Sequence, residues 1–436
     1  MKAIKKFACL ATAACLTLGA VSALVGCGGS DGTLLVWAHT QELKDIIEDY
    51  YFVSYPEKAD KVRVEVYPDD VFQTKLDGVL TTGINAPDVM VLQIGYIQKY
   101  IQKGSLESLS SGGLDLAGKA DEVCYDYTLE VATGEDGNLY GLAWQAIPGG
   151  YFYRRSVADE LWGQSDPEFV QSKMSTWDDF MQVAYELKTH GDKRIMSSLN
   201  GSLDVFVSQR EQPWIVDNKL VIQDFVTEYF EHCRALQQGI SGSNPPQGLY
   251  VNETQEFTTG WYTDMSNPNI FGFFLPAWGM QYYLKQYCGD TYGDWGLIRG
   301  PVSWFSGSSM LSVYEGSKNK EEAKELIEYL CLNEEFLEKY ARESGEFVNN
   351  TNVVNTIKQD CSEPFLDGQN HYALFDEWAG DVRGDTVGPY DSAIYTLFKD
   401  VSIQYALMSD GYETLGEAVD MFKALIRNSF PTLTVE

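Results

Sequence analysis

Over residues 34–92, strand-like and helix-like patterns of hydrophobic residues alternate along the chain. Residues 34–38 and 89–92 are continuous apolar runs, which are typical of strands buried on both faces. Residues 62–66 alternate valine with charged side chains, which indicates a half-buried strand. Between these runs, apolar residues recur at helical spacing over 43–50 and 72–80. Strands separated by helices predict parallel pairing in a doubly wound α/β sheet.

Polar and aromatic residues follow two of the predicted strands. Trp37, His39 and Gln41 lie at or just after the end of the first strand, and Gln93 and Tyr96 follow the third. In open α/β sheets, ligands sit beyond the carboxyl ends of the strands. We therefore expect these five residues at one rim of a ligand site. For His39 the alternative is an ordinary solvated histidine in a loop.

Two later segments carry signals for the start of a helix. Thr176 precedes an apolar helical pattern, and Asp179 stands three residues later, as in a capping box. Asn319 and Glu322 have the same spacing, and apolar residues follow at helical positions up to residue 330. We expect a helix to begin after each of these N-cap residues.

The N-terminus has the pattern of an export signal. Three lysines stand within the first six residues, and residues 7–21 are apolar and rich in small side chains. The following Leu-Val-Gly-Cys resembles the lipobox of bacterial lipoproteins, which predicts a signal peptide over 1–26 and a lipid on Cys27. Residues 27–32 are then a lipidated tether, and the protein is held at the outer face of the cytoplasmic membrane. The alternative is an uncleaved membrane anchor.

Charge and aromatic content narrow the ligand class. The chain has 436 residues, with 63 acidic and 32 basic side chains and a formal charge of -31. A chain this acidic repels phosphate backbones, so we expect no binding to nucleic acid. Aromatic residues make up 13% of the sequence, which leaves rings for a ligand surface after the core is filled.

Cysteine spacing does not indicate a metal site or a fixed disulfide framework. Five cysteines follow Cys27, and none are spaced as CxxC: Cys124, Cys233, Cys288, Cys331 and Cys361. An export compartment permits disulfides, but an odd number leaves at least one cysteine without an intramolecular partner. We assign no pair.

Catalytic motifs are absent from the sequence. Residues 113–120 approach a phosphate-binding loop, but Ala120 stands where a magnesium-binding Ser or Thr is needed. There is no HExxH motif, and the four histidines are scattered. We expect no enzyme activity, metal or cofactor. A carboxylate pair for glycoside hydrolysis stays open as an alternative, because acids are abundant and counting does not single one out.

Several segments resemble one family in their order along the chain. "NAPDVMVLQ" followed by "YIQKGSLESLS" is similar to the early signature of the extracellular solute-binding proteins of ABC importers, family 1, the maltose-binding-protein-like group. Later segments keep the family's order: "DGNLYGLAWQAIPGGYFYRR", "MSTWDDFMQVAYELK", "FTTGWYTDM", "FGFFLPAWGM" and "GDWGLIRGPVSWFSGSSMLSVYEGSKNKEEAKELIEYL". Two departures concern the ligand. The family's G-x-x-A-M segment is one residue longer here, and Gln93 or Tyr96 stands where an acidic ligand residue is often found.

The resemblance implies an architecture and a function. The expected fold is α/β, a type II periplasmic-binding-protein-like fold with two lobes, each a doubly wound sheet flanked by helices, and a ligand cleft between them. Lobe 1 is expected over 33–143 with 309–345, and lobe 2 over 144–308 with 346–436. The expected function is that of a monomeric, lipid-anchored substrate-binding subunit, which captures a mono- or oligosaccharide, closes over it and delivers it to the permease of an ABC importer.

Aromatic residues in irregular segments are the remaining ligand candidates, because rings cover the C–H faces of sugars while polar groups bond to their hydroxyls. Trp144 lies at the crossing between lobes that the resemblance implies, and Trp304 lies near another. Trp278 follows an apolar run and a proline. Tyr390 and Asp391 lie where the family places a C-terminal ligand loop. Each tryptophan has core packing as its alternative.

Other tryptophans and other ligands remain open at this point. We assign Trp162, Trp177 and Trp295 to the core and leave Trp261 and Trp378 unassigned. A binder of a peptide, polyamine or other small cation is an alternative function that the acidity favours. An anchored extracellular enzyme is a second alternative.

Overall fold

The computed structural model describes residues 32–436 except 112, 240–247, 251–255 and 308. The predicted signal peptide, Cys27 and most of the predicted tether lie outside the described residues. Residues Gly32–Glu436 form one compact unit. The five cysteines after Cys27 are free thiols. Among the described residues, no helix combines the length and apolarity needed to cross a bilayer.

The first sheet has five strands in the order β2-β1-β3-β11-β4. Its strands are β1 (Leu34–Ala38), β2 (Val62–Val66), β3 (Val89–Gln93), β4 (Leu142–Ala143) and β11 (Ser309–Val313). Strand β1 pairs in parallel with both β2 and β3, which confirms the three predicted strands and their parallel pairing. Strand β11 joins from far along the chain and runs antiparallel to β3 and β4.

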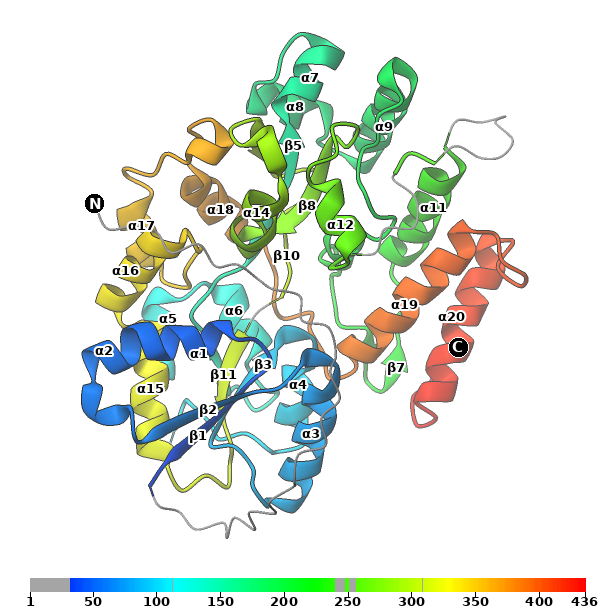
Figure 1. Cartoon of the computed structure of the whole chain (residues 1–436). Helices are drawn as coiled ribbons and strands as arrows, with labels where there is room; N and C mark the ends of the chain where they lie inside the picture. Colours follow the sequence, from blue (N-terminus) through cyan, green and yellow to red (C-terminus); the bar gives the residue numbers. More distant parts are fainter. Residues whose placement is uncertain (1–31, 112, 240–247, 251–255, 308) are drawn as a thin grey trace, which may run out of the picture. The chain divides into compact units, whose positions relative to one another are not determined.

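Helices that follow these strands cover the first sheet (Figure 1). They are α1 (Glu42–Ile46), a π-helical turn (Ile47–Tyr51), α2 (Phe52–Ser54), a 3-10 turn (Pro56–Lys58), α3 (Asp69–Thr82), α4 (Ile94–Gln102), α5 (Ala117–Val123) and α6 (Asp126–Val131). The two helical patterns predicted between the strands are confirmed. Phe72 and Leu76 are fully buried on α3, because their spacing places both on its apolar face.

The second sheet is built around β5 (Pro148–Arg154), which is buried along its whole length. Three strands pair antiparallel to it: β8 (Gly272–Pro276), β9 (Trp295–Ile298) and β10 (Trp304–Phe305). A Cβ atom at Gly149 would lie 2.3 Å from the Trp304 ring, so glycine is needed here to let that ring lie across β5. A separate two-stranded hairpin pairs β6 (Ile215–Val216) with β7 (Lys219–Leu220).

The helices around the second sheet include the predicted start after Thr176. They are α7 (Arg155–Trp162), α8 (Pro167–Lys173), α9 (Trp177–Gly191), α10 (Leu203–Val207), α11 (Asp224–Gln238), α12 (Thr259–Asp264), α13 (Ala277–Gly279), a π-helical turn (Met280–Leu284), α14 (Lys285–Tyr287), a 3-10 turn (Gly289–Thr291), α19 (Asp391–Ala406) and α20 (Leu415–Ser429). The Thr176 hydroxyl accepts a hydrogen bond from the backbone N–H of Asp179 at 3.1 Å, so this N-cap is confirmed.

Four helices and a 3-10 turn lie between β11 and α19. They are α15 (Lys320–Leu332), α16 (Glu334–Ser344), α17 (Thr351–Ile357), the turn Pro364–Leu366 and α18 (His371–Ala379). Helix α15 begins after Asn319 as predicted, but the expected side-chain cap is wrong. The Asn319 amide instead donates hydrogen bonds to the Thr33 carbonyl and the Asp88 carboxylate, which lie just before strands β1 and β3 of the first sheet.

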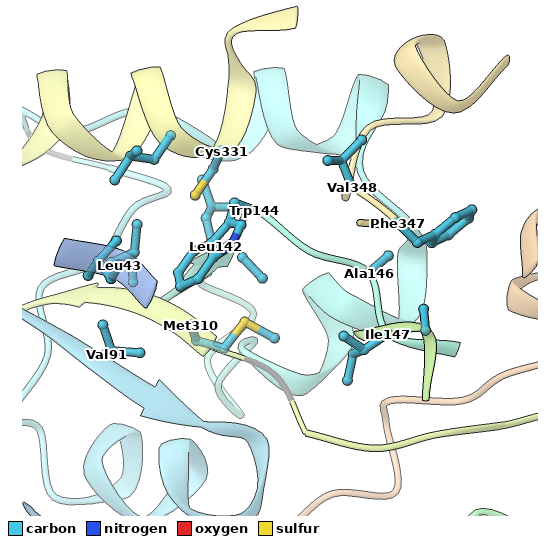
Figure 2. Close-up of a cluster of buried hydrophobic side chains, with 14 of the residues drawn as sticks. Leu43, Val91, Leu142, Trp144, Ala146, Ile147, Met310, Cys331, Phe347 and Val348 are labelled. Atoms are coloured by element: carbon cyan, nitrogen blue, oxygen red, sulfur yellow. The ribbon is translucent and has the colours of Figure 1, made fainter. Parts of the chain in front are cut away.

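Two passages of chain run side by side between the sheets. The segment 144–147 connects β4 to β5, and residues 345–348 follow α16. The Ala146 N–H donates to the Phe347 carbonyl at 3.0 Å, and the Asn349 N–H donates to the Trp144 carbonyl at 2.9 Å. Both passages cross the buried hydrophobic cluster drawn in Figure 2, in which Trp144 is 1% exposed. Packing therefore holds the passages together where the chain changes sheets.

Candidate functional site

A cavity of about 1230 Å³ is lined by residues that follow strands of both sheets. On one side, the lining comes from the loop and helix after β1 and from the end of β3. We call this side the polar wall, defined as His39, Gln41, Asp45, Asp49, Asp69 and Gln93. On the other side lies a group of rings in mutual contact, which we call the aromatic wall, defined as Phe257, Trp261, Trp278 and Tyr283.

The structure brings most of the predicted ligand residues to this cavity. Seven of the ten line it: His39, Gln41, Gln93, Tyr96, Trp278, Trp304 and Asp391. The other three lie elsewhere. Trp37 packs against Tyr67 with ring centroids 4.7 Å apart, Trp144 lies in the core, and Tyr390 packs against Phe430 at 5.1 Å.

Side chains of the polar wall bond mainly to one another. The Gln41 amide donates to Asp45 at 2.9 Å, and the Gln93 amide donates to Asp69 at 3.2 Å. His39 Nδ1 lies 3.9 Å from Asp69. Burial lowers the pKa of His39 more than the Asp69 carboxylate raises it, so the imidazole is neutral at pH 7. The wall offers donors and acceptors at the rim predicted from the strand ends.

The aromatic wall is positioned by short helical segments rather than by strands. Trp278 follows β8 and Pro276, as predicted, and its indole N–H donates to the Ser306 carbonyl at 3.1 Å. The Phe257 ring lies 6.3 Å from that of Trp278 at an angle of 24°. Tyr283 contacts both Trp261 and Trp278, with ring centroids 5.6 Å away from each. These contacts fix the rings before any ligand arrives.

Most of this wall is not among the ligand residues predicted from the sequence. Trp261 was left unassigned, and Phe257 and Tyr283 were not considered. The signal that identifies them is density, because aromatic residues recur throughout 257–287. The residues called core behave as expected where they are buried: Trp295 is 0% exposed, and Trp177 stacks on Phe206 with centroids 4.0 Å apart.

One end of the cavity holds a buried carboxylate network. Glu42 accepts hydrogen bonds from the hydroxyls of Tyr340 at 3.0 Å and Tyr282 at 3.2 Å, and from the Gln145 amide at 2.9 Å. Gln145 also donates to Glu346 at 3.0 Å. Burial raises the pKa of Glu42, and burial together with the neighbouring Glu42 raises that of Glu346 well above its usual value. Burial and the adjacent Glu42 carboxylate thus favour the protonated form of Glu346 in the folded protein.

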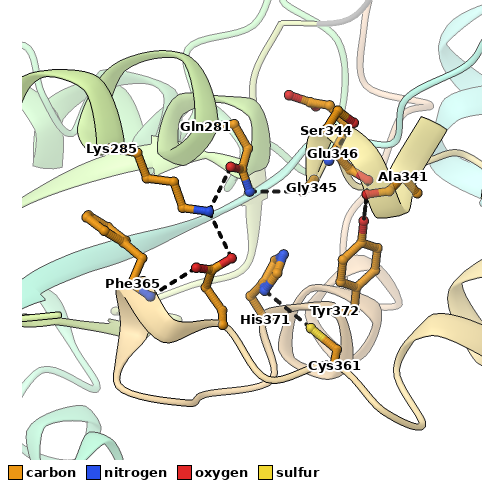
Figure 3. A network of polar contacts seen from close by, with 11 residues as sticks. Gln281, Lys285, Ala341, Ser344, Gly345, Glu346, Cys361, Phe365, His371 and Tyr372 are labelled. Atoms are coloured by element: carbon orange, nitrogen blue, oxygen red, sulfur yellow. Dashed lines mark hydrogen bonds and ion pairs between the residues drawn. The ribbon is translucent and has the colours of Figure 1, made fainter. Parts of the chain in front are cut away.

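The passage that carries Glu346 is fixed by side chains on both sides (Figure 3). The Gln281 amide donates to the Gly345 carbonyl at 3.1 Å, and the Tyr372 hydroxyl donates to the Glu346 carbonyl at 2.6 Å. Lys285 bonds to Gln281 and Glu363, each at 2.8 Å. Gly345 has a φ of 79°, and a Cβ atom there would lie 2.3 Å from the Gln281 amide nitrogen. The passage thus has one well-defined conformation.

Two further carboxylates lie deeper in the cavity lining. Asp204, at α10, accepts hydrogen bonds from the Tyr395 hydroxyl at 2.5 Å and from the Ser306 hydroxyl. Burial raises the pKa of Asp204, and burial together with Asp204 raises the pKa of Glu256 to about 8. In the part of the chain that the structure describes, no Lys or Arg forms an ion pair with either carboxylate.

Asp391 has a different role from these acids. Its carboxylate lies 2.6 Å from the Arg210 guanidinium and also accepts the Gly388 N–H at 3.0 Å. It lies at the first residue of α19, lines the cavity and joins that helix to the end of α10, and its predicted role in ligand binding stays a prediction. Its charge is neutralised by Arg210, so its main effect is to position the chain around residue 388.

Comparisons with known proteins agree with this geometry. A family model described as bacterial extracellular solute-binding protein matches residues 37–230. The arabinooligosaccharide-binding protein of Halalkalibacterium halodurans is 23% identical over 333 residues, which are 70% of this chain and 68% of that protein.

Solved structures extend the likeness to nearly the whole chain. A structure of an extracellular solute-binding protein of family 1 has a TM-score of 0.74 at 16% identity and covers 92% of this chain and 99% of its own. The ABC transporter associated binding protein of B. animalis subsp. lactis, in complex with beta-1,6-galactobiose, has a TM-score of 0.70 at 22% identity, with 93% and 99% covered. The predicted family resemblance and the type II periplasmic-binding-protein-like α/β fold are confirmed. The expectation of a doubly wound parallel sheet in the second lobe is wrong, because all three strands that pair with β5 run antiparallel to it.

Proposed function

We propose that this chain is a bacterial extracellular solute-binding protein that captures an oligosaccharide in its cavity and delivers it to the permease of an ABC importer. The observation that carries this proposal is a preformed aromatic wall on one side of the cavity and a hydrogen-bonding polar wall on the other. Sugars present C–H faces and hydroxyls, which require both surfaces.

The size of the cavity supports an oligosaccharide over a monosaccharide. Its volume of about 1230 Å³ exceeds the roughly 300–1,000 Å³ of pockets for drug-sized ligands. The relatives point the same way, since one is an arabinooligosaccharide-binding protein and another was solved with a galactobiose.

Capture is proposed to close two lobes over the sugar. Lobe 1 would comprise 33–143 with 309–345, and lobe 2 would comprise 144–308 with 346–436. The passages at 144–147 and 345–348, which run side by side, are suitable hinges because a small change of φ and ψ in each moves the elements beyond it. Closure would also let the permease distinguish loaded from empty protein.

A lipid on Cys27 is proposed to hold the protein at the outer face of the cytoplasmic membrane. The lipobox-like Leu-Val-Gly-Cys after a cationic, apolar leader supports this. We expect Cys27→Ala to leave the precursor uncleaved or to release protein into the medium, as seen by fractionation and immunoblotting. Normal processing with full membrane retention would contradict the anchor.

A thermal-shift and calorimetric screen against neutral mono- and oligosaccharides tests the function. A ligand that binds only the native state raises the melting temperature by mass action. We expect at least one oligosaccharide to bind, with no product formed on long incubation. Product formation would favour the glycoside-hydrolase alternative, and failure of every saccharide would contradict the proposal.

A cationic solute such as a polyamine or peptide is the second candidate. The acidic lining of the cavity favours it, because Arg210 is the sole Lys or Arg among the described lining residues. The aromatic wall favours a sugar, since polyamines have no ring face to stack. Spermidine in the same screen separates the two.

A further inference from the structure

The charge balance of the cavity is strongly one-sided. Seven of the described lining residues are acids: Glu42, Asp45, Asp49, Asp69, Asp204, Glu256 and Asp391. Arg210 is the one basic residue opposite them, and Asp391 already pairs with it at 2.6 Å. Neutral hydroxyls accept as well as donate hydrogen bonds, so a neutral sugar requires no such excess of carboxylates. The imbalance points to a ligand that brings positive charge.

Asp204 and Glu256 concentrate this imbalance at one place. Asp204 receives hydrogen bonds from two neutral hydroxyls and has no cationic partner within ion-pair distance among the described residues. No described side chain donates a hydrogen bond to Glu256. The nearest basic influence is Lys399, whose charge opposes but does not overcome the burial of both groups. Two neighbouring carboxylates that face a cavity without a counter-ion are unfavourable when both are ionised.

Trp304 supplies a second, independent sign of a ligand at this place. Its side chain is 2% exposed, it lines the same cavity, and its indole N–H has no hydrogen-bond partner among the described residues. It stands two residues before Ser306, which donates to Asp204. A buried hydrogen-bond donor without a partner costs free energy, and a ligand that accepts its hydrogen bond removes that cost. A hydroxyl or ring oxygen of a saccharide is such an acceptor.

We propose that Asp204 and Glu256 form a subsite for a protonated amino group on the bound saccharide, so that the ligand is an amino sugar or an oligosaccharide that contains one. This inference rests on the proposed carbohydrate function and specifies its ligand class. The ammonium group supplies the missing counter-ion. The C–H faces of the sugar that bears it stack on the aromatic side chains of the same cavity. A neutral sugar leaves Asp204 and Glu256 without a counter-ion, and a linear polyamine leaves the aromatic wall without a partner.

Calorimetry with matched ligands tests the inference on the purified full chain in mild detergent. Cello-, chitosan and chitin oligosaccharides of equal length differ at C2, where they carry a hydroxyl, an ammonium or an N-acetyl group. Galactose, galactosamine and N-acetylgalactosamine form a second set. We expect the amine to bind at least tenfold more tightly than its N-acetylated and hydroxyl counterparts. Glu256→Gln should bring this ratio close to one, whereas Glu228→Gln, an exposed acid on α11 outside the cavity, should leave it unchanged.

Proton release provides a second readout that simple loss of folding does not produce. Glu256, with its pKa near 8, is largely protonated in the empty cavity at pH 7. An ammonium group beside it lowers that pKa, so binding releases protons. Titrations in buffers of different ionisation enthalpy should show more protons released per amino sugar by the wild type than by Glu256→Gln. Equal release by both proteins would overturn the assignment of Glu256.

The outcomes separate the inference from the function on which it rests. If neutral saccharides bind as tightly as their amino counterparts, the amine subsite is wrong and the carbohydrate function stands. If spermidine binds and no saccharide of either kind does, the carbohydrate function itself is wrong. If the amine preference survives in Glu256→Gln, the positive charge is recognised elsewhere and the assigned subsite is overturned.

Discussion

The polar wall and the aromatic wall face one cavity, but the chain positions them by different means. His39, Gln41 and Gln93 follow the carboxyl ends of parallel strands, so the topology of the sheet places them. Phe257, Trp261, Trp278 and Tyr283 belong to short helical segments and a loop, and contacts among their own rings place them. The first wall is set by backbone pairing and the second by side-chain packing.

The two walls also differ in how much water they meet. Gln41, Asp45, Asp49 and Asp69 are exposed, and their hydrogen bonds to a ligand replace bonds to water. Trp261 is 2% exposed and Trp278 is half-buried, whereas Phe257 is 54% exposed. Rigid aromatic side chains lose little entropy on binding. The aromatic wall should therefore contribute most of the affinity, and the polar wall most of the choice among sugars.

The largest expected effect comes from removing the Trp278 ring from the aromatic wall. Trp278→Ala should weaken binding of the best saccharide tenfold or more, since losing one aromatic contact in a desolvated pocket costs about 1–4 kcal/mol. Calorimetry measures the change. Tyr292→Ala removes an exposed ring outside the cavity and should leave affinity unchanged. An intact melting transition with unchanged affinity in Trp278→Ala would place the binding energy elsewhere and reverse the comparison.

The second effect concerns the strand beneath Trp304. In Gly149→Ala the new Cβ atom would lie 2.3 Å from the Trp304 ring, so the ring must move. Overpacking of this kind costs about 1–3 kcal/mol of stability. We expect a lower melting temperature and an altered near-ultraviolet spectrum from tryptophan. Gly118→Ala, where nothing lies within 4 Å of the added atom, is the matched control and should not destabilise the protein.

The sequence predicted the polar wall better than the aromatic wall for the same physical reason. Parallel strands and their ends follow from local hydrophobic patterns, so His39 and Gln93 were placed correctly at the cavity. Trp144 and Trp304 both lie near changes of sheet, yet Trp144 is in the core and Trp304 lines the cavity. Which face a ring presents depends on distant partners, such as Gly149 beneath Trp304, and local pattern does not contain that information.

The buried acids were beyond prediction for a related reason. Glu42 lies at the start of α1, where an acidic residue is ordinary and usually solvated. Its burial comes from Tyr282 and Tyr340, which lie about 240 and 300 residues away along the chain. Asp204 and Glu256 are likewise brought together by packing. An acid-rich sequence offers no local means of selecting these from the other carboxylates.

The third effect tests the carboxylate network between the walls. Because the pKa of Glu346 is higher in the folded protein than in the unfolded chain, the native state binds more protons above the unfolded pKa. The contribution of this group to the free energy of unfolding therefore falls as pH rises from about 4.5 toward its folded pKa. We expect Glu346→Gln to resemble the wild type at pH 5 and to be more stable than it at pH 8, by on the order of 1 kcal/mol.

Urea denaturation at the two pH values measures this difference. Glu346 is replaced by Gln because Gln keeps the shape of the protonated acid and can still accept the hydrogen bond from the Gln145 amide. Glu228→Gln changes the same charge at an exposed site and should leave the pH dependence as in the wild type. A variant that is less stable than the wild type at pH 8 would mean that folding does not raise the pKa of Glu346.

The smallest expected effect, and the one that bears most directly on the two walls, is a change in size. Four of the six side chains of the polar wall are exposed in this structure, so their hydrogen bonds gain strength only if water is excluded when a sugar binds. A ligand moves the walls together only if it binds the closed arrangement more tightly than the open one. A sugar that stacks on Trp278 and bonds to Gln41 and Gln93 at the same time meets this condition, because only closure lets it contact both walls.

X-ray scattering from the soluble form that lacks residues 1–27 should then show a radius of gyration a few per cent smaller with saturating ligand. Trp278→Ala at the same ligand concentration should show less of the change, in proportion to its lost affinity. An identical radius with and without ligand, with binding confirmed in the same samples, would mean that the walls are already at their final separation and that the passages at 144–147 and 345–348 are not hinges.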